Sequence, residues 1–195
     1  DISDIETQIA KSSGEEKLSL LQKLADKWDD LAKAAPQGFI YEEMAKISPK
    51  SDYWLKAGNA YRTAYTNLQD STLAQVLTQN AIRTYEEALK VNAASLEAKT
   101  GLGAAMVSGS GNPMAGIALL REVVTAEPKN VEANKTLGLF SLQSQQFDKA
   151  INRFKTVIEV KPDAESYFYL ATGYENIGMK SDAVAAYKQS KQLAA

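Results

Sequence analysis

The residue types that most enzymes use for proton transfer and nucleophilic attack are missing from this chain. Its 195 residues include no histidine and no cysteine. This excludes an imidazole general base, a thiol nucleophile, a disulfide and a Cys/His zinc site. Any catalysis would have to use carboxylates, lysine or tyrosine, and we expect no catalytic residue, no cofactor and no metal.

Three acidic pairs come closest to a proton-sharing site: Asp29-Asp30, Glu42-Glu43 and Glu86-Glu87. Adjacent residues on a helix point in different directions, so the two members of a pair cannot share one proton. We interpret all three pairs as parts of solvated helix faces.

Residues 108–112, Ser-Gly-Ser-Gly-Asn, form a glycine-rich segment of the kind that can bind phosphate ahead of a helix. No lysine follows at the spacing of a phosphate-binding loop, and no strand precedes it. We therefore interpret the segment as a flexible turn, with Asn112 as the N-cap and Pro113 as the first residue of the next helix.

The charge balance argues against a nucleic-acid partner. Lys and Arg number 22 and Asp and Glu number 24, for a net charge of −2, whereas nucleic-acid-binding domains usually carry a basic excess. Apolar runs such as Gly101–Val107 are far shorter than the roughly 20 residues that span a bilayer. The sequence predicts a folded domain without a transmembrane segment.

One order of residue types recurs along the chain: large, large-small, aromatic, small, aromatic, small, proline. In residues 131–163 it appears as Leu137-Gly138, Ser141, Phe147, Ala150, Phe154 and Pro162. The period is about 34 residues, which is typical of a two-helix repeat. The copies are residues 18–50, 51–95, 96–130, 131–163 and 164–195.

This order resembles the tetratricopeptide repeat (TPR), a helix–turn–helix unit. The resemblance implies an all-α, right-handed superhelical solenoid of about five repeats spanning residues 18–195. Residues 1–17 lie outside it, and Ile2, Ile5 and Ile9 predict a short helix and linker there. That helix could cap the first repeat, occupy the groove, or belong to a linker toward a membrane anchor.

Small residues at repeat positions predict close contact between the paired helices. Gly58 is matched with Ala81, and Gly138 with Ala150, while Tyr85 fills the space beside the first pair. The prolines fall where helices must start or stop: Pro49, Pro128 and Pro162 between repeats, Pro36 and Pro113 at helix starts.

The second repeat carries about 11 extra residues relative to the usual spacing. The insert, residues 62–80, keeps a helical apolar stripe, and we expect both helices to be longer by one to two turns. Gln69–Thr72 is the expected turn, with Thr72 and Gln75 spaced as a capping box. The insert is either a tolerated extension or an added contact surface.

In TPR proteins the first helices line a concave groove that contacts the partner. The resemblance places twelve residues of this chain there: Leu55, Asn59, Arg62, Thr100, Ala104, Val107, Lys135, Leu139, Leu142, Phe168, Thr172 and Glu175. Only Asn59 and Lys135 fit the family's clamp for a peptide carboxylate, so we do not expect one. The predicted groove is mixed and fairly apolar, which suits an amphipathic helix or an extended peptide. Alternatively, several of these side chains pack against neighbouring repeats.

These patterns favour a non-catalytic scaffold that binds a protein or peptide. The alternatives are a self-assembling structural subunit, or an enzyme or small-ligand binder that uses carboxylates, lysine or tyrosine. Val184, Tyr187 and Leu193 predict an uncovered apolar edge on the last helix, where a second copy could form a homodimer. The chain begins with Asp1 rather than Met, which indicates a trimmed piece. Its long second repeat resembles bacterial envelope proteins, so we expect a periplasmic or membrane-anchored protein, with the cytoplasm as the alternative.

Overall fold

The structure is a computed structural model that describes residues 1–66, 68, 70–109 and 112–194. These residues form eleven α-helices and no strand, which confirms the predicted all-α class. The chain divides into two compact units, Asp1–Gly111 and Asn112–Ala195. The boundary falls inside the predicted third repeat, so the two helices of that repeat belong to different units.

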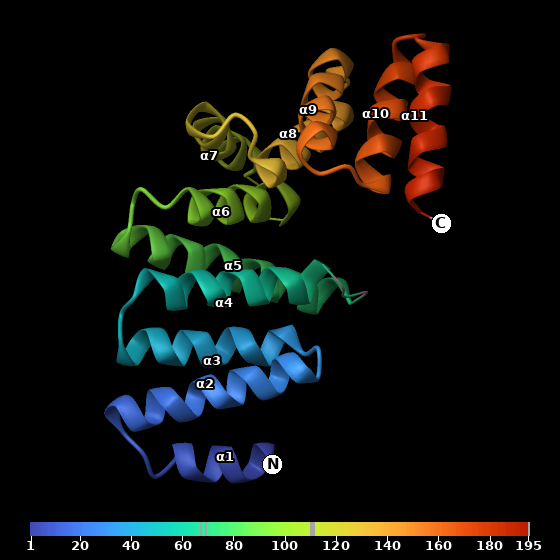
Figure 1. The fold of residues 1–195 in the computed structure, drawn as a ribbon. Helices are drawn as coiled ribbons and strands as arrows, with labels where there is room; N and C mark the ends of the chain where they lie inside the picture. The colour runs from blue at the N-terminus through green and yellow to red at the C-terminus, as the bar shows by residue number, and fades with distance from the viewer. Residues whose placement is uncertain (67, 69, 110–111, 195) are drawn as a thin grey trace. The chain divides into compact units, whose positions relative to one another are not determined.

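The first unit holds six helices, each packed on its sequence neighbour (Figure 1). They are α1 (Ile2–Ile9), α2 (Gly14–Asp30), α3 (Ala34–Ile47), α4 (Ser51–Thr66), α5 (Ser71–Val91) and α6 (Leu96–Gly109). The second unit holds five helices packed in the same consecutive way. They are α7 (Pro113–Ala126), α8 (Val131–Gln143), α9 (Phe147–Val160), α10 (Ala164–Asn176) and α11 (Lys180–Leu193).

The helix ends follow the residues that favour them. Pro49, Pro128 and Pro162 all lie between helices, and Pro36 lies in the first turn of α3, as predicted. The side chain of Asn112 accepts a hydrogen bond from the backbone amide of Ala115 and so caps α7, whose first residue is Pro113. The N-cap and the proline are confirmed, while Ser110 and Gly111 of the expected turn lie outside the described residues.

The long hairpin of α4 and α5 is lengthened unequally. α4 has 16 residues and α5 has 21, against 14 in α7, α9 and α11. At 3.6 residues per turn, the insert therefore adds about two turns to α5 and less than one to α4. Figure 1 shows this hairpin reaching beyond the ends of α3 and α6.

The predicted capping box at Thr72 is wrong, because α5 starts two residues earlier. The N-cap is Asp70, whose carboxylate accepts hydrogen bonds from the amides of Thr72 and Leu73 at 2.9 and 3.0 Å. An aspartate satisfies these free amides and also complements the helix dipole. Gln69, the first residue of the expected turn, lies outside the described residues.

Aromatic rings rest on glycines of the neighbouring helices. A Cβ atom on Gly58 of α4 would lie 2.7 Å from the ring of Tyr85 on α5, and one on Gly101 of α6 would also overlap that ring. In the second unit, a Cβ on Gly138 of α8 would lie 2.9 Å from the ring of Phe154 on α9. The sequence paired these glycines with Ala81 and Ala150. The structure shows instead that the repeat's own aromatic residue takes the space.

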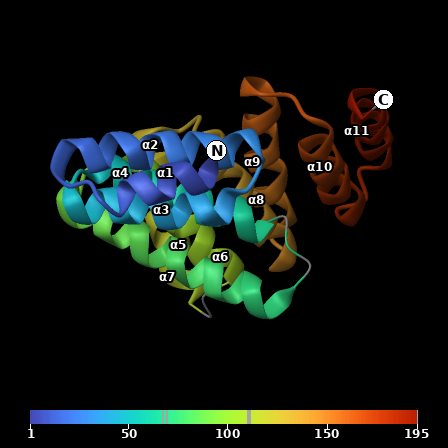
Figure 2. The ribbon, with the colours of Figure 1, turned by 90° about the horizontal axis from the view of Figure 1, so that it is seen from below.

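The N-terminal helix α1 packs against α2 (Figures 1 and 2). Its three isoleucines, Ile2, Ile5 and Ile9, contact a buried cluster that includes Leu21 and Met44. Of the three roles left open by the sequence, capping the first repeat is therefore the one that this packing supports.

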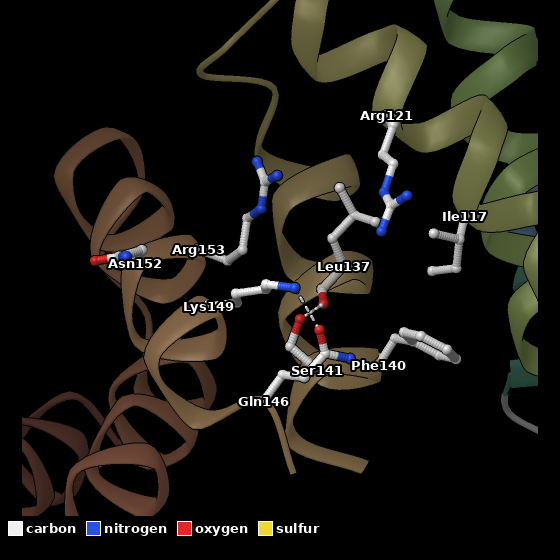
Figure 3. Close-up of a pocket in the computed structure, with 9 residues that line it drawn as sticks. All are labelled: Ile117, Arg121, Leu137, Phe140, Ser141, Gln146, Lys149, Asn152 and Arg153. Carbon is white, nitrogen blue, oxygen red and sulfur yellow. Dashed lines mark hydrogen bonds between the residues drawn. The ribbon is translucent and has the colours of Figure 1, made fainter. Parts of the chain in front are cut away.

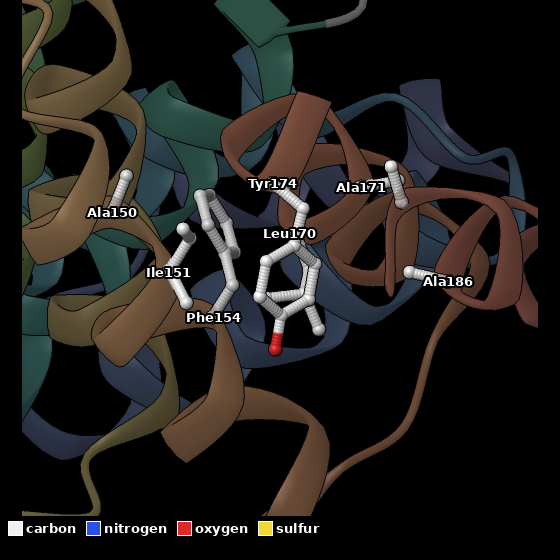
Figure 4. Packing of buried hydrophobic residues seen from close by; sticks show 8 residues of the cluster. Ala150, Ile151, Phe154, Leu170, Ala171, Tyr174 and Ala186 are labelled. Atoms are coloured by element: carbon white, nitrogen blue, oxygen red, sulfur yellow. The ribbon is translucent and has the colours of Figure 1, made fainter. Parts of the chain in front are cut away.

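The second unit has its own core between α9, α10 and α11. Ile151 and Phe154 of α9 point toward Leu170 and Tyr174 of α10 (Figure 4), and all four are at most 8% exposed. Within the described ranges, no helix has both the length and the apolar character that crossing a membrane requires. The same ranges contain no group of three or more acidic side chains placed to hold a metal ion.

Candidate partner-binding surfaces

The predicted groove residues of the first unit lie on α4 and α6. Leu55, Asn59, Arg62 and Val107 are half-buried. Thr100 and Ala104, in contrast, are only 4% and 7% exposed, so they cannot offer a side chain to a partner. α6 is buried around most of its circumference, because seven of its 14 residues are covered.

Asn59 is engaged inside the first unit. Its side-chain oxygen accepts a hydrogen bond from the hydroxyl of Tyr85 at 2.7 Å, and its amide donates to Glu97 on α6 at 3.4 Å. Asn59 therefore fixes the buried ring of Tyr85 and links α4 to α6.

In the second unit the predicted residues lie on α8 and α10, and they form a more apolar surface. Leu139 and Leu142 of α8 are half-buried and pack against the core of α9, α10 and α11. Phe168 of α10 is 49% exposed. Its ring meets the rings of Tyr169 and Tyr187 edge-on, with centroids 5.7 Å apart in both cases. Phe168 thus keeps a large apolar face toward solvent while neighbouring rings restrict its motion.

Thr172 and Glu175 border this apolar surface. The hydroxyl of Tyr187 donates to Glu175 at 2.8 Å. Hydrogen bonding with Thr172 lowers the pKa of Tyr187, but burial and the Glu175 carboxylate outweigh it, so the pKa lies above its ordinary value. The sequence predicts that Tyr187, Val184 and Leu193 are uncovered. Tyr187 instead packs on Phe168. Val184 and Leu193 are 52% and 48% exposed, as predicted.

Lys135 on α8 forms two ion pairs with acidic residues at the start of α10. Its ammonium lies 2.7 Å from Glu165 and 3.4 Å from Asp163. Burial would lower the pKa of Lys135, but the bond to Glu165 and the two negative charges outweigh it and raise the pKa. Both Asn59 and Lys135, the only fits to a carboxylate clamp, are thus engaged with neighbours in their own units.

The acidic pair Glu42-Glu43 is not the solvated face that we expected. Glu42 on α3 is 5% exposed. It accepts hydrogen bonds from the hydroxyl of Tyr61 on α4 at 2.7 Å and from the guanidinium of Arg83 on α5 at 2.6 Å. Adjacent acids diverge on a helix, as expected, but one of these two points inward and needs its partners.

A tyrosine hydroxyl and a carboxylate meet in this cluster, as they could in an active site, but their burial indicates a structural role. Tyr61 is 0% exposed, so its hydroxyl cannot reach a substrate. Burial, followed by the hydrogen bond to Glu42, raises the pKa of Tyr61 far above its ordinary value, which keeps it protonated. The Glu42–Tyr61–Arg83 cluster joins three helices of the first unit.

Comparisons with known proteins agree with the repeat assignment. Residues 108–172 match the tetratricopeptide repeat family. A crystal structure of MamA is 23% identical, covers 88% of this chain and 94% of its own, and superposes with a TM-score of 0.66. MamA residues 41 to the end from Desulfovibrio magneticus RS-1 are 18% identical, cover 94% of this chain and 97% of that chain, and give a TM-score of 0.70. A comparison with curated protein sequences gives no significant match.

At these identities the structural likeness establishes the fold. The predicted TPR resemblance is confirmed by the repeat match, which runs through α7, α8 and α9 into α10. The all-α TPR fold is confirmed by the MamA structures.

Proposed function

We propose that this chain, which has the fold of tetratricopeptide repeat proteins, is a non-catalytic scaffold that binds a protein partner. The observation that carries the proposal is the apolar character of α8 and α10, where Phe168 of α10 is 49% exposed and Leu139 and Leu142 of α8 are half-buried. An exposed aromatic residue with restricted motion, bordered by polar groups, is a typical anchor for a peptide. The mixed net charge of −2 favours a protein over a nucleic acid as the partner.

The partner's chemistry follows from this surface. Phe168, Leu139 and Leu142 offer apolar contacts, and Glu175 lies at the border. An amphipathic helix, or an extended peptide with apolar anchors, fits such a strip. A basic residue on the partner next to its apolar anchors would meet Glu175.

A pair of phenylalanines provides a matched test. Phe168→Glu places a charge on the proposed surface, whereas Phe39→Glu does the same at a 59% exposed position on α3, outside it. Both rings also contact a tyrosine edge-on, so their structural costs are comparable. Cross-linking and mass spectrometry of the full-length protein in its native cell should identify a partner whose recovery falls about tenfold with Phe168→Glu.

Phe39→Glu should leave recovery of that partner unchanged, and circular dichroism should show the same helicity for both variants. Equal recovery with the two variants would remove Phe168 and its neighbours from the binding surface. Measurable turnover of a substrate by the purified protein would instead support the enzyme alternative.

Self-association is the second candidate, and a specific observation favours it. Val184 and Leu193 on α11 leave about half of their surface exposed, at 52% and 48%. A second copy of the chain could cover these residues. Sedimentation should then show a mass that rises with concentration and stays monomeric in Val184→Glu. A monomer at every concentration would exclude this interface.

We also propose a bacterial envelope location, with the cytoplasm as the alternative. The support is the long second repeat, whose helices reach 16 and 21 residues. Fractionation of native cells distinguishes the two compartments.

A further inference from the structure

The second unit contains a cavity of about 220 Å³ between α7, α8 and α9. Its apolar side is formed by Ile117, Leu137 and Phe140. Its charged groups are Arg121, Lys149 and Arg153, and Figure 3 shows Arg121 on α7 at one side and the other two on α9. No described Asp or Glu lines the cavity. The cavity is therefore positively charged in a chain whose acids outnumber its bases.

The three cations differ in how they are held. The guanidinium of Arg153 donates to the side-chain oxygen of Asn134 at 2.9 Å. Asn134 is 0% exposed and also donates to the backbone oxygens of Pro128 and Asn130, so it forms a rigid support. The ammonium of Lys149 donates to the side chain of Gln146 at 2.6 Å. Both partners are neutral, so neither cation has its charge balanced.

Arg121 completes the cavity from the opposite helix. Across the described part of the chain, its guanidinium makes no hydrogen bond or ion pair with another side chain. Burial, and then the positive charge of Arg121, lower the pKa of Arg153 from its ordinary value. The two guanidinium groups therefore repel each other across the cavity, and an anion between them would remove that repulsion.

We propose that this cavity binds an oxyanion, the phosphate or carboxylate group of a ligand, between Arg121 and Arg153. Guanidinium groups offer planar pairs of donors that match phosphate and carboxylate oxygens. Lys149, which also lines the cavity, supplies a third positive charge. The site does not depend on the apolar surface of α8 and α10, so either one can exist without the other.

The size of the cavity limits the ligand. A volume of 220 Å³ holds about seven water molecules, at roughly 30 Å³ each. Pockets for drug-sized ligands and cofactors run from about 300 to 1,000 Å³. The cavity therefore takes one charged group, either free phosphate or the end of an acidic or phosphorylated side chain on a peptide.

The test is calorimetric titration of the purified full-length chain with inorganic phosphate, at an ionic strength fixed with chloride. Arg121→Gln removes a cavity charge whose side chain makes no hydrogen bond or ion pair with the described residues, and Lys188→Gln removes a charge from the exposed face of α11. We expect saturable binding that weakens about tenfold or more in Arg121→Gln, the loss expected for charged hydrogen bonds. Lys188→Gln should bind within about twofold of the unaltered chain.

Two further variants keep the result interpretable. Lys149→Gln should weaken binding in the same direction, which protects the conclusion if Arg121→Gln lowers stability. Arg121→Lys keeps the charge but loses the planar donor pair, so it should bind more weakly than the unaltered chain.

Three peptides identical except for one central serine, glutamate or phosphoserine identify the source of the oxyanion. Binding of the glutamate or phosphoserine peptide, in competition with phosphate, assigns the site to a peptide side chain. Binding of phosphate alone assigns it to the free ion. The proposal is overturned if neither phosphate nor any charged peptide binds, or if Arg121→Gln binds as tightly as the unaltered chain.

Discussion

Two arginines on the second helices of their hairpins have contrasting surroundings. Arg83 on α5 donates to the buried carboxylate of Glu42, and this bond outweighs the opposing effect of burial and raises the pKa of Arg83. Arg153 on α9 donates to the neutral amide of Asn134, and burial together with Arg121 lowers its pKa. The first unit thus neutralises Arg83 internally, whereas the second unit gives Arg153 a neutral partner.

This difference separates a structural cluster from a binding site. A buried charge is tolerated when a partner of opposite charge lies beside it. Glu42 is that partner in the first unit. In the second unit Arg153 lines a cavity instead, and we infer that a ligand supplies the negative charge.

The largest expected effect comes from removing the internal partner. Glu42→Ala leaves the hydroxyl of Tyr61 buried without an acceptor and Arg83 without its counter-charge. We expect the free energy of unfolding to fall by about 2–4 kcal/mol, measured by urea denaturation. Asn134→Ala, the comparable change in the second unit, removes a neutral partner of Arg153 and two bonds to backbone oxygens, and it should cost about 1–3 kcal/mol.

Glu43→Ala is the control for Glu42→Ala, because it removes the adjacent acid with its half-exposed ion pair to Lys17. Its cost should stay below about 1 kcal/mol. If Glu42→Ala cost no more than Glu43→Ala, the first unit would not depend on an internal counter-charge.

The glycine–ring contacts give the next largest effect. Gly→Ala inside a helix normally stabilises by about 0.5–1 kcal/mol. Here the added methyl group would lie 2.7 Å from Tyr85 at Gly58 and 2.9 Å from Phe154 at Gly138. We expect both changes to destabilise, by about 2–3 kcal/mol at Gly58 and about 1 kcal/mol at Gly138.

The reason for the difference is how each ring is held. Tyr85 lies between Gly58 and Gly101, and Asn59 fixes its hydroxyl, whereas Phe154 lies against Gly138 and has no hydroxyl that a neighbour could fix. Thermal melts of the two variants test the order. A rise in melting temperature for either variant would show that its ring can move aside.

The smallest expected effect concerns Lys135, a cation of the second unit that has acidic partners, unlike the three cations of the cavity. Burial by itself raises the pKa of Asp163, but the amide and hydroxyl of Ser166 and the charge of Lys135 outweigh it and lower the pKa. A lowered pKa in the folded state adds stability above the unfolded value of about 3.9 and loses it as the pH falls through the folded value.

Asp163→Asn removes the negative charge but keeps the helix cap, because asparagine caps a helix as well as aspartate does. The variant should be less stable by about 0.5–1 kcal/mol at pH 7, and the difference should shrink steadily below about pH 4. Unfolding curves recorded across this pH range measure it. A difference that does not depend on pH would mean that the cap, and not the charge, was lost.

The sequence predicted the fold well because the repeat pattern records local packing. Leu137-Gly138, Phe154 and Pro162 specify a helix, its contact and its end within a few turns of chain. Asn112 and Pro113 specify the start of α7 in the same way. The prediction for the start of α5 is wrong because Asp70, two residues before Thr72, caps the helix instead.

The site residues were harder to predict because their roles depend on distant neighbours. Glu42 is buried against residues 19 and 41 positions further along the chain. The repeat pattern placed Thr100 and Ala104 in the groove. They are buried because α6 has seven buried residues, against five in each of α8 and α10, the first helices of the next two repeats. The sequence contains one weak indication of the cavity: Arg121 and Arg153 both lie on the second helices of successive repeats.

The contrast between Arg83 and Arg153 can be measured directly, because the chain has only four arginines, at positions 62, 83, 121 and 153. Their side-chain Nε–H signals can be followed by NMR during titration with phosphate at constant ionic strength. We expect saturable shifts of the Arg121 and Arg153 signals and no shift of Arg83. Small linear shifts of all the signals, or a shift of Arg83 equal to that of Arg153, would contradict the account.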